Sequence, residues 1–410
     1  MKRHGAGAMT TSMLDIAPFI PGDTALAQSA LPDKAVTLVT LSARLTGQLA
    51  PLTLATLEWH MAAINSYYSN LIEGNATLPH EIRAAQRGDY SGDPARRDLQ
   101  LESLAHMQVQ EWLRAQAPDL DTLFSTAFIR RVHQEFYVRI PESLWIVHDE
   151  QGKAMDTVVP GEWRTRRVKV GQHVPPPDAD LPDLMQAFCE TYKPGRFKGD
   201  RRLIAIMAAH HRFAWIHPFL DGNGRVGRLL TDAALKAAGL ESYGAWCLSR
   251  GLAKSASRYK GLLAGADAPR QGDYDGRGAL SEAGLLAFCD YLLDTATDQV
   301  AYMSGLLDLP GLRNRIDSYV RARNDLRVPG MTEPLKATAA LVLYTAFIHG
   351  EIERAQALEL CAMPERSARR LLSQMKSEGL LSETSSKSPL RWEIPEHAEA
   401  WYFPGLAPLS

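Results

Sequence analysis

The chain has 410 residues, 45% of them hydrophobic, which is enough for two or three domains with sizeable cores. Its formal net charge of −2 gives no overall sign of affinity for nucleic acids or membranes. The four cysteines are far apart and form no paired motif, and no segment has the pattern of a signal peptide or a membrane span. We therefore expect reduced thiols, a cytoplasmic location and no membrane contact.

Helical spacing of apolar residues dominates the sequence and predicts a mainly α fold. Residues 1–30 are rich in Pro, Gly, Ala and Ser, so we expect an irregular arm there. The helical pattern then covers residues 34–49, 53–72, 98–117, 121–140, 201–216, 226–238, 257–263 and 280–307. The Gly- and Asp-rich residues 264–278 predict a loop before the last of these helices.

One segment among these helices has a different pattern. Residues 160–171 combine turn residues with β-branched alternation, and several prolines follow them. This pattern is typical of a β-hairpin. From the residues alone, the segment is a basic hairpin that faces solvent.

The composition shifts after Pro310. Residues 313–327 predict a charged helix within a linker at 310–331. Three more helical segments, at 335–348, 354–361 and 365–378, precede a short two-stranded segment at 379–394. Residues 331–395 contain eight basic and eight acidic residues, so this module is not basic as a whole.

The stretch His217–Arg228 carries the clearest chemical pattern. It lies between two predicted helices, and Gly222 and Gly224 permit a tight turn whose amides point inward toward a ligand. The positive end of the following helix favours bound anions, so the loop is suited to a phosphate. A neutral imidazole of His217 could remove a proton from an incoming hydroxyl.

Three further side chains complete this pattern. Asp221 offers a hard oxygen ligand for Mg²⁺, and Arg225 and Arg228 lie on one helix face, where they could bind outer phosphates. Each of these residues also has a structural interpretation as a helix cap or a solvent-exposed side chain. Their occurrence together within twelve residues favours a site for nucleotide-dependent transfer.

The stretch resembles the signature of the Fic (filamentation induced by cAMP) family, His-x-Phe-x-(Asp/Glu)-Gly-Asn-Gly-Arg-x-x-Arg, at every defined position. The resemblance implies transfer of AMP from ATP to a Ser, Thr or Tyr hydroxyl of a protein. It makes His217 the general base, Asp221 the Mg²⁺ ligand, and Asn223 with the loop amides, including that of Gly222, the cradle of the α-phosphate. Arg225 and Arg228 would bind the β- and γ-phosphates. Gly224 distinguishes the chain from a kinase-like branch that has Lys there.

A second motif lies near the end of the predicted helix at 53–72. Ser69 and Glu73 are four residues apart and share a helix face, and Gly74 ends the helix. On its own, Glu73 could be a solvated side chain. The segment resembles the (Ser/Thr)-x-x-x-Glu-(Gly/Asn) inhibitory helix of Fic proteins, which implies that Glu73 pairs with Arg228 in place of the γ-phosphate and inhibits transfer.

The resemblance also gives the predicted hairpin a role. In Fic proteins such a hairpin is a flap onto which the target segment adds as a strand. The residues implied in this docking are Arg166, Val168, Val170 and Gly171. The partner would be a protein with a modifiable hydroxyl, which includes a second copy of the chain, and a homodimer is compatible with the sequence.

The C-terminal segments resemble a winged helix-turn-helix module. Its third helix carries the residues that could contact DNA, namely Arg366, Arg369 and Arg370. The balanced charge makes protein docking an equal alternative.

The complete interpretation is a mainly α protein with a Fic-type helical core, a β-hairpin flap and a C-terminal winged helix. The expected parts are an N-terminal helical region (1–110) carrying the inhibitory helix, a catalytic core (111–309), a linker helix (310–331), a winged-helix domain (332–395) and a tail (396–410). Two alternatives remain open at this stage. The enzyme could remove AMP from a modified protein with Glu73 orienting water, or the chain could be a transcriptional regulator that binds DNA.

Three other histidines lie near the motif or in a neighbouring helix. We interpret His133 as a packed or capping residue, because nothing near it in the sequence completes a metal pattern. His210 and His211 could in principle join His217 and Asp221 around zinc, but their spacing matches no recognised ligand set.

Overall fold

The computed structural model describes residues 11–148 and 151–408 and confirms a mainly helical fold. The N-terminal elements are η1 (Met13–Ile16), α1 (Asp23–Ala27), α2 (Leu31–Gly47), α3 (Pro51–Ile72), α4 (Pro79–Gln86) and α5 (Pro94–Gln116). A central series follows, comprising α6 (Leu120–Leu123), α7 (Thr126–Tyr137), η2 (Glu142–Trp145), β1 (Ile146–His148), β2 (Ala154–Thr157), η3 (Asp178–Asp180), α8 (Leu181–Tyr192), η4 (Pro194–Arg196), α9 (Asp200–Ile216), α10 (Asn223–Ala237), α11 (Leu248–Lys254), α12 (Ala256–Ala266) and α13 (Glu282–Leu306).

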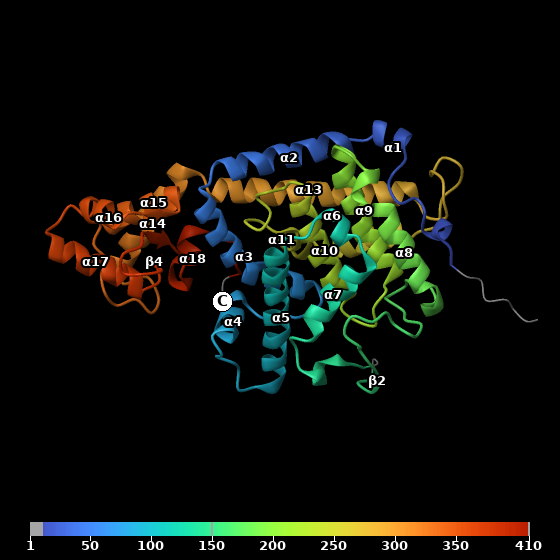
Figure 1. Cartoon of the computed structure of the whole chain (residues 1–410), viewed down its shortest axis with the longest axis horizontal. Helices are drawn as coiled ribbons and strands as arrows, with labels where there is room; N and C mark the ends of the chain where they lie inside the picture. Colours follow the sequence, from blue (N-terminus) through green and yellow to red (C-terminus); the bar gives the residue numbers. More distant parts are fainter. Residues whose placement is uncertain (1–10, 149–150, 409–410) are drawn as a thin grey trace, which may run out of the picture.

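The C-terminal elements form a separate group at one end of the molecule (Figure 1). They are α14 (Leu309–Asn324), α15 (Ala339–His349), β3 (Glu351–Ile352), α16 (Arg354–Leu360), α17 (Glu365–Ser377), β4 (Leu381–Ser382), β5 (Leu390–Trp392) and α18 (Glu396–Tyr402). Within the described residues, none of the helices combines the length and apolar character needed to cross a bilayer.

Helix α3 is the central element of the N-terminal half. Every residue from His60 to Asn70 is buried, because α3 packs against α4, α5 and α11 on different sides. Polar side chains therefore line part of its surface, and each needs a hydrogen-bond partner inside the protein. Along one side of the core, α2 and α13 run next to each other as a long helical pair (Figure 1).

Helices α9 and α10 pack together and meet at the His217–Arg228 loop. Leu203, Ile206 and Phe213 of α9 are buried, as are Val226 and Leu229 of α10. This apolar packing fixes the directions in which the two helices enter and leave the loop. The loop is thus held between two rigid elements.

Two expectations for the middle of the chain were wrong. The helix expected at 121–140 is divided into α6 and α7, because the Ser125 hydroxyl accepts the Phe128 amide and caps a new helix. The hairpin expected at 160–171 is formed instead by β1 and β2, with Val147 opposite Asp156. Residues 160–171 have no strand, because Arg164 donates its backbone amide to Pro218 in the His217–Arg228 loop (2.9 Å).

The C-terminal module has the predicted helices followed by a short sheet. The expected pair β4 and β5 is extended by β3, giving the antiparallel order β3-β5-β4 with Glu351 opposite Arg391 and Leu381 opposite Trp392. Trp392 is fully buried and packs edge-on against Phe347 of α15. The winged-helix assignment of this module stays a prediction.

Of the tail expected at residues 396–410, the structure describes residues 396–408. These residues include α18, after which the chain returns to the core beside α3 and α4 (Figure 1). Glu399 of α18 pairs with Arg83 of α4 (2.5 Å), and Tyr68 of α3 donates to the carbonyl of Leu406 (3.1 Å). The sequence pattern missed this because the helix is short and its apolar residues contact several different elements.

Candidate active site

The loop between α9 and α10 has the backbone of an anion-binding turn. His217 ends α9 in the left-handed region (φ 49°), and Gly222 also has positive φ (80°) directly before α10. A Cβ atom at position 222 would lie 3.0 Å from the Tyr137 ring, so glycine is required on both grounds. The first amides of α10 have no partner within the helix and carry its positive dipole end.

Asn223 holds this turn in shape. Its side-chain amide accepts from the Phe219 nitrogen (2.9 Å) and donates to the Phe219 oxygen (2.8 Å). The amide nitrogen keeps a second N–H, so the contact of Asn223 with the α-phosphate stays a prediction. The amides of the first turn of α10 are also suited to a phosphate.

His217 is half-buried at the start of the loop. Burial, with the nearby charges of Arg164 and His173, lowers the pKa of His217 to about 4. The imidazole is therefore neutral at neutral pH. A neutral imidazole is the form that can accept a proton from a hydroxyl.

Asp221 lies at the other side of the loop with its side chain 48% exposed. Burial of its carboxylate raises the pKa, but Arg225 and the Tyr137 hydroxyl (2.6 Å) outweigh this effect, so the pKa of Asp221 is lowered. The group is an ionised hard oxygen donor open to a ligand. The described residues contain no cluster of three or more His, Cys, Asp or Glu that could hold a metal. Asp221 therefore fits Mg²⁺ only where phosphate oxygens and water supply the other ligands.

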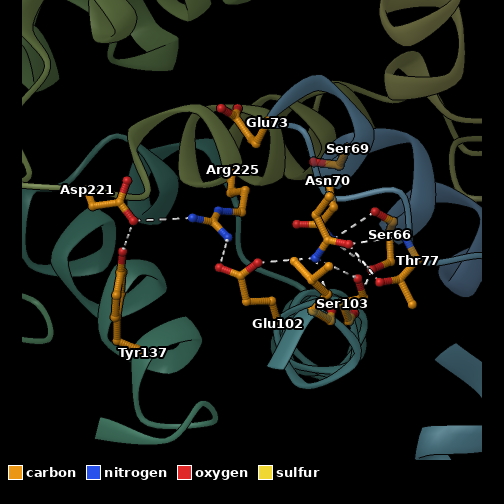
Figure 2. A network of polar contacts seen from close by, with 12 residues as sticks. Ser66, Ser69, Asn70, Glu73, Thr77, Glu102, Ser103, Tyr137, Asp221 and Arg225 are labelled. Carbon is orange, nitrogen blue, oxygen red and sulfur yellow. Dashed lines mark hydrogen bonds and ion pairs between the residues drawn. The ribbon is translucent and has the colours of Figure 1, made fainter. Parts of the chain in front are cut away.

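Arg225 is buried beneath the loop. Its guanidinium donates to Glu102 of α5 (2.8 Å) and to Asp221 (3.3 Å), and lies 4.8 Å from the Phe136 ring centroid. Glu102 also accepts from Asn75, which follows α3 (3.1 Å). Figure 2 shows this polar network, which links the loop to the connection between α3 and α4.

Arg228 is bound by the predicted inhibitory helix. Its guanidinium donates to the Glu73 carboxylate (2.7 Å), to the Ser69 hydroxyl (2.9 Å) and to the Ser69 carbonyl (3.0 Å). The Arg228 side chain is 3% exposed and that of Glu73 is 38% exposed. Burial raises the pKa of Glu73, yet Arg228 and Arg225 lower it by more, so the carboxylate is ionised.

The Glu73 carboxylate also occupies space over the first turn of α10. A Cβ atom at Gly224 would overlap Glu73 Oε1 and would lie 3.1 Å from an Arg228 nitrogen. The carboxylate is therefore packed directly against the helix N-terminus, where a phosphate group of a ligand would be stabilised. The structure thus brings the Ser69–Gly74 motif into contact with the His217–Arg228 motif.

A profile of the Fic/DOC family matches residues 123–235, which include α6 to α10 and the loop just described. The part of the chain that forms this site therefore matches the Fic/DOC family. Over 86 residues it is 42% identical to the protein adenylyltransferase Fic of Drosophila willistoni, a match that covers 21% of this chain and 17% of the relative. Over 106 residues it is 35% identical to that of Drosophila mojavensis, covering 26% of this chain and 21% of the relative. The chain thus spans about a fifth of the length of these relatives.

Solved structures agree on the fold. A Fic family protein from Desulfovibrio desulfuricans G20 is 18% identical with a TM-score of 0.50, covering 88% of this chain and 95% of that one. Fic-1 (aa134–508) from C. elegans is 15% identical with a TM-score of 0.53, covering 69% of this chain and 74% of that one.

Arg164 is a buried residue of this site that no pattern in the sequence singled out. Its guanidinium donates to the carbonyls of His217 (2.9 Å), Arg166 (2.9 Å) and Pro176 (2.6 Å). It therefore holds the segment 158–177 against the start of the His217–Arg228 loop. No motif identifies it, because it lies in an irregular segment far from the signature in sequence.

His133 is fully buried and stacks on Phe219 at 3.9 Å, as expected of a packed histidine. Its Nδ1 accepts the Gly161 amide (2.8 Å), so the ring hydrogen is on Nε2, which lies 3.3 Å from the Asp221 carbonyl. Burial lowers the pKa of His133 to about 4. The neutral ring thus joins the segment 158–177 to the His217–Arg228 loop.

The other two histidines have different partners. His210 lies 2.7 Å from both the Thr231 hydroxyl and the Tyr259 hydroxyl. His211 lies 3.0 Å from the Asp267 carboxylate. Both therefore take part in contacts between α9 and its neighbours.

The predicted docking residues lie in the irregular segment beside β2. Arg166 donates to the Met155 carbonyl (3.3 Å) and lies 3.6 Å from the Asp156 carboxylate. Val170 and Gly171 are exposed, Val168 is half-buried, and a single antiparallel bridge joins Val170 to His173. The docking of a target segment at this flap stays a prediction.

The predicted DNA-contacting residues are all exposed on α17. Arg369 pairs with Glu365 on the same helix (2.6 Å). Among the residues that the structure describes, Arg366 and Arg370 have no ion pair. The charge available to an anionic partner is therefore small, and the choice between DNA and protein docking stays open.

Proposed function

We propose that the chain is a protein adenylyltransferase that transfers AMP from ATP to a Ser, Thr or Tyr hydroxyl of a protein. The observation that carries this proposal is one loop that combines a neutral His217, an ionised Asp221 and the N-terminus of α10. The match of residues 123–235 to the Fic/DOC family and the likeness to Fic adenylyltransferases support it.

Different residues of the chain would act on the hydroxyl, the α-phosphate and the leaving group. His217 takes the proton from the target hydroxyl, whose oxygen forms a bond to the α-phosphorus while the bond to pyrophosphate breaks. The amides of the first turn of α10 stabilise charge on the α-phosphate, and Arg225 and Arg228 stabilise the leaving group. When bound, Mg²⁺ would be held by Asp221 and would neutralise phosphate charge.

Glu73 would inhibit this reaction. Its carboxylate takes the guanidinium of Arg228 and the space over Gly224, so the γ-phosphate cannot bind there without displacing it. ATP would then bind in a pose unsuited to in-line attack. Removal of the carboxylate frees both the charge of Arg228 and the space beside it.

Intact-mass analysis after incubation with ATP and Mg²⁺ tests the proposal, with wild type, Glu73→Gly and the double variant Glu73→Gly/His217→Ala compared. We expect an AMP-sized gain by self-labelling in Glu73→Gly that is absent from the double variant. A phosphate-sized gain would show kinase-like chemistry instead. The proposed transfer would be contradicted if no variant gained mass and if proteins of an added lysate also stayed unlabelled.

The reverse reaction is a second candidate, because Glu73 is 38% exposed beside the site and could orient water. The substrate for this test is Glu73→Gly protein that has labelled itself with AMP and has then been separated from ATP. The Glu73→Gly/His217→Ala variant cannot serve as substrate, because it is not expected to label itself. Loss of AMP on adding wild type, but not on adding Glu73→Gln, would favour AMP removal as the main activity.

A further inference from the structure

Arg225 is covered by two carboxylates that come from different elements. Its Nη1 donates to Oε1 of Glu102 on α5 (2.8 Å), and its Nη2 donates to Oδ2 of Asp221 in the loop (3.3 Å). Figure 2 shows the guanidinium between these two acids. The Arg225 side chain is only 8% exposed. A phosphate of a nucleotide can therefore bind Arg225 only where one of the two carboxylates gives way.

Glu102 is held in this position by the turn that follows Glu73. Its second oxygen, Oε2, accepts from Nδ2 of Asn75 (3.1 Å), a residue that is 4% exposed. The same Nδ2 donates to the Leu99 carbonyl of α5 (3.0 Å), which fixes the Asn75 side chain against that helix. The Glu102 carboxylate thus joins the turn after Glu73 to Arg225, with one oxygen for each partner.

The charges at this end of α10 oppose an anionic ligand. Among the described residues, three carboxylates lie within ion-pair distance of Arg225 and Arg228, namely Glu73, Glu102 and Asp221. The acids therefore outnumber the two arginines, and each unshared negative charge repels a phosphate. Asp221 is the proposed ligand of Mg²⁺ and keeps its place. Glu102 is the partner of Arg225 that is left to give way.

We propose that Glu102 competes with an outer phosphate of ATP for Arg225, as Glu73 is proposed to compete for Arg228. The Glu102 side chain is 22% exposed, so it can turn toward solvent when the phosphate binds. Arg225 stays in place, because its guanidinium lies 4.8 Å from the centroid of the Phe136 ring and is held by Asp221. Glu102 thus lowers the affinity for ATP by acting through Arg225. This role rests on the proposed function, since it assigns Arg225 to the outer phosphates.

Titration calorimetry with ATP and with AMP tests the competition in a His217→Ala background, in which the proposed transfer does not occur. Glu102→Gln removes the charge and keeps the size of the side chain. We expect this variant to bind ATP about tenfold more tightly, because one charge-assisted hydrogen bond no longer competes. Its affinity for AMP should not change, because AMP has no outer phosphate. Glu111→Gln on the same helix is the matched control.

The proposal would be overturned if Glu102→Gln bound ATP no more tightly than its parent, if neither protein bound ATP, or if AMP gained as much as ATP. Glu102→Asp separates charge from shape, because it keeps the negative charge on a shorter side chain. Its affinity for ATP should stay closer to that of the parent, and equal tightening in Asp and Gln variants would also overturn the proposal. If Glu102→Gln does not fold, as judged by circular dichroism, Asn75→Ala removes the donor that holds Glu102. It should then tighten ATP binding by a smaller factor, and unchanged binding would contradict the competition.

Rates of AMP incorporation at several ATP concentrations give a second readout in the Glu73→Gly background. Glu102→Gln should lower KM for ATP and leave kcat nearly unchanged, because the target hydroxyl and the α-phosphate keep their partners. A lower kcat with an unchanged KM would contradict the competition. Failure of Glu73→Gly to acquire AMP would instead refute the proposed function, whereas the affinities for ATP and AMP are measured without any reaction and would stand.

Discussion

Arg228 of the Fic signature donates twice to Ser69 of α3, through Nε to the hydroxyl (2.9 Å) and through Nη2 to the carbonyl (3.0 Å). Ser69 is fully buried, so these bonds are shielded from water. The same nitrogen Nη2 also donates to Glu73 (2.7 Å). Ser69 therefore fixes the orientation in which Arg228 meets the Glu73 carboxylate.

Replacement of Ser69 by Ala should weaken this orientation while leaving Glu73 in place. The loss of one hydrogen bond to a charged group, about 1–2 kcal/mol, predicts a rise of about fivefold to thirtyfold in the rate of self-labelling with AMP. The rise should be smaller than that of Glu73→Gly. Ser373→Ala, an exposed change on α17, is the matched control. An unchanged rate in Ser69→Ala would show that the hydroxyl does not contribute to inhibition.

Arg164→Ala should detach the segment 158–177 from the His217–Arg228 loop, because three backbone carbonyls lose their donor. In the Glu73→Gly background we expect at least about a tenfold loss of AMP transfer to an added protein substrate. The exposed neighbour Arg167→Ala should have little effect. Equal rates for the two variants, with equal circular dichroism spectra, would show that Arg164 does not position His217.

Asn223→Ala should destabilise the protein as well as the site. Both the amide and the carbonyl of buried Phe219 would lose their partner, at a cost of about 1–3 kcal/mol for each group left unsatisfied. Urea unfolding of wild type and variant measures this difference. A variant with wild-type stability would show that water replaces the amide and that the loop keeps its shape without it.

The helices and the two Fic motifs were predictable because their signals are local. Apolar spacing marks α3, α9 and α10, and the His217–Arg228 stretch contains its own glycines and charges. The contact between Glu73 and Arg228 was also implied by the resemblance, and the structure shows it at 2.7 Å. The helices and motifs required no knowledge of how distant segments pack, whereas the Glu73–Arg228 contact joins residues 155 positions apart and was expected only from the resemblance.

The remaining site residues could not be predicted, because their roles arise from tertiary contacts. Glu102 meets Arg225 across 123 positions in sequence, and Arg164 meets His217 across 53. The hairpin was misplaced because the alternation at 160–171 resembles a strand, whereas its backbone pairs with Pro218. Short-range patterns contain no information on such partners.

Buried histidines should make the protein sensitive to acid. His133 and His210 have pKa values lowered by burial to about 4 and about 3, against about 6.5 in the unfolded chain. The unfolded state therefore binds protons first, so stability is complete above pH 6.5 and is lost as the pH falls toward 4. Between pH 7 and pH 5 each should cost about 2 kcal/mol of unfolding free energy.

Urea unfolding at several pH values measures this slope. The slope of unfolding free energy against pH reports the number of protons taken up on unfolding. His210→Gln should lower this number by about one over this range, whatever its effect on stability at pH 7. Replacement of the exposed His80 by Gln is the control for a general effect of removing a histidine. A slope that His210→Gln leaves unchanged would contradict the assignment of a neutral, buried ring.

In the proposed function, the Glu73 carboxylate blocks transfer by binding Arg228 beside Gly224. The most direct measurement is the initial rate of AMP incorporation at several ATP concentrations for wild type, Glu73→Gly and the exposed control Glu241→Gly. We predict a rise of about tenfold to a hundredfold in Glu73→Gly alone, as expected for loss of a charge-assisted hydrogen bond that competes with the phosphate. Equal rates in all three proteins would contradict the account.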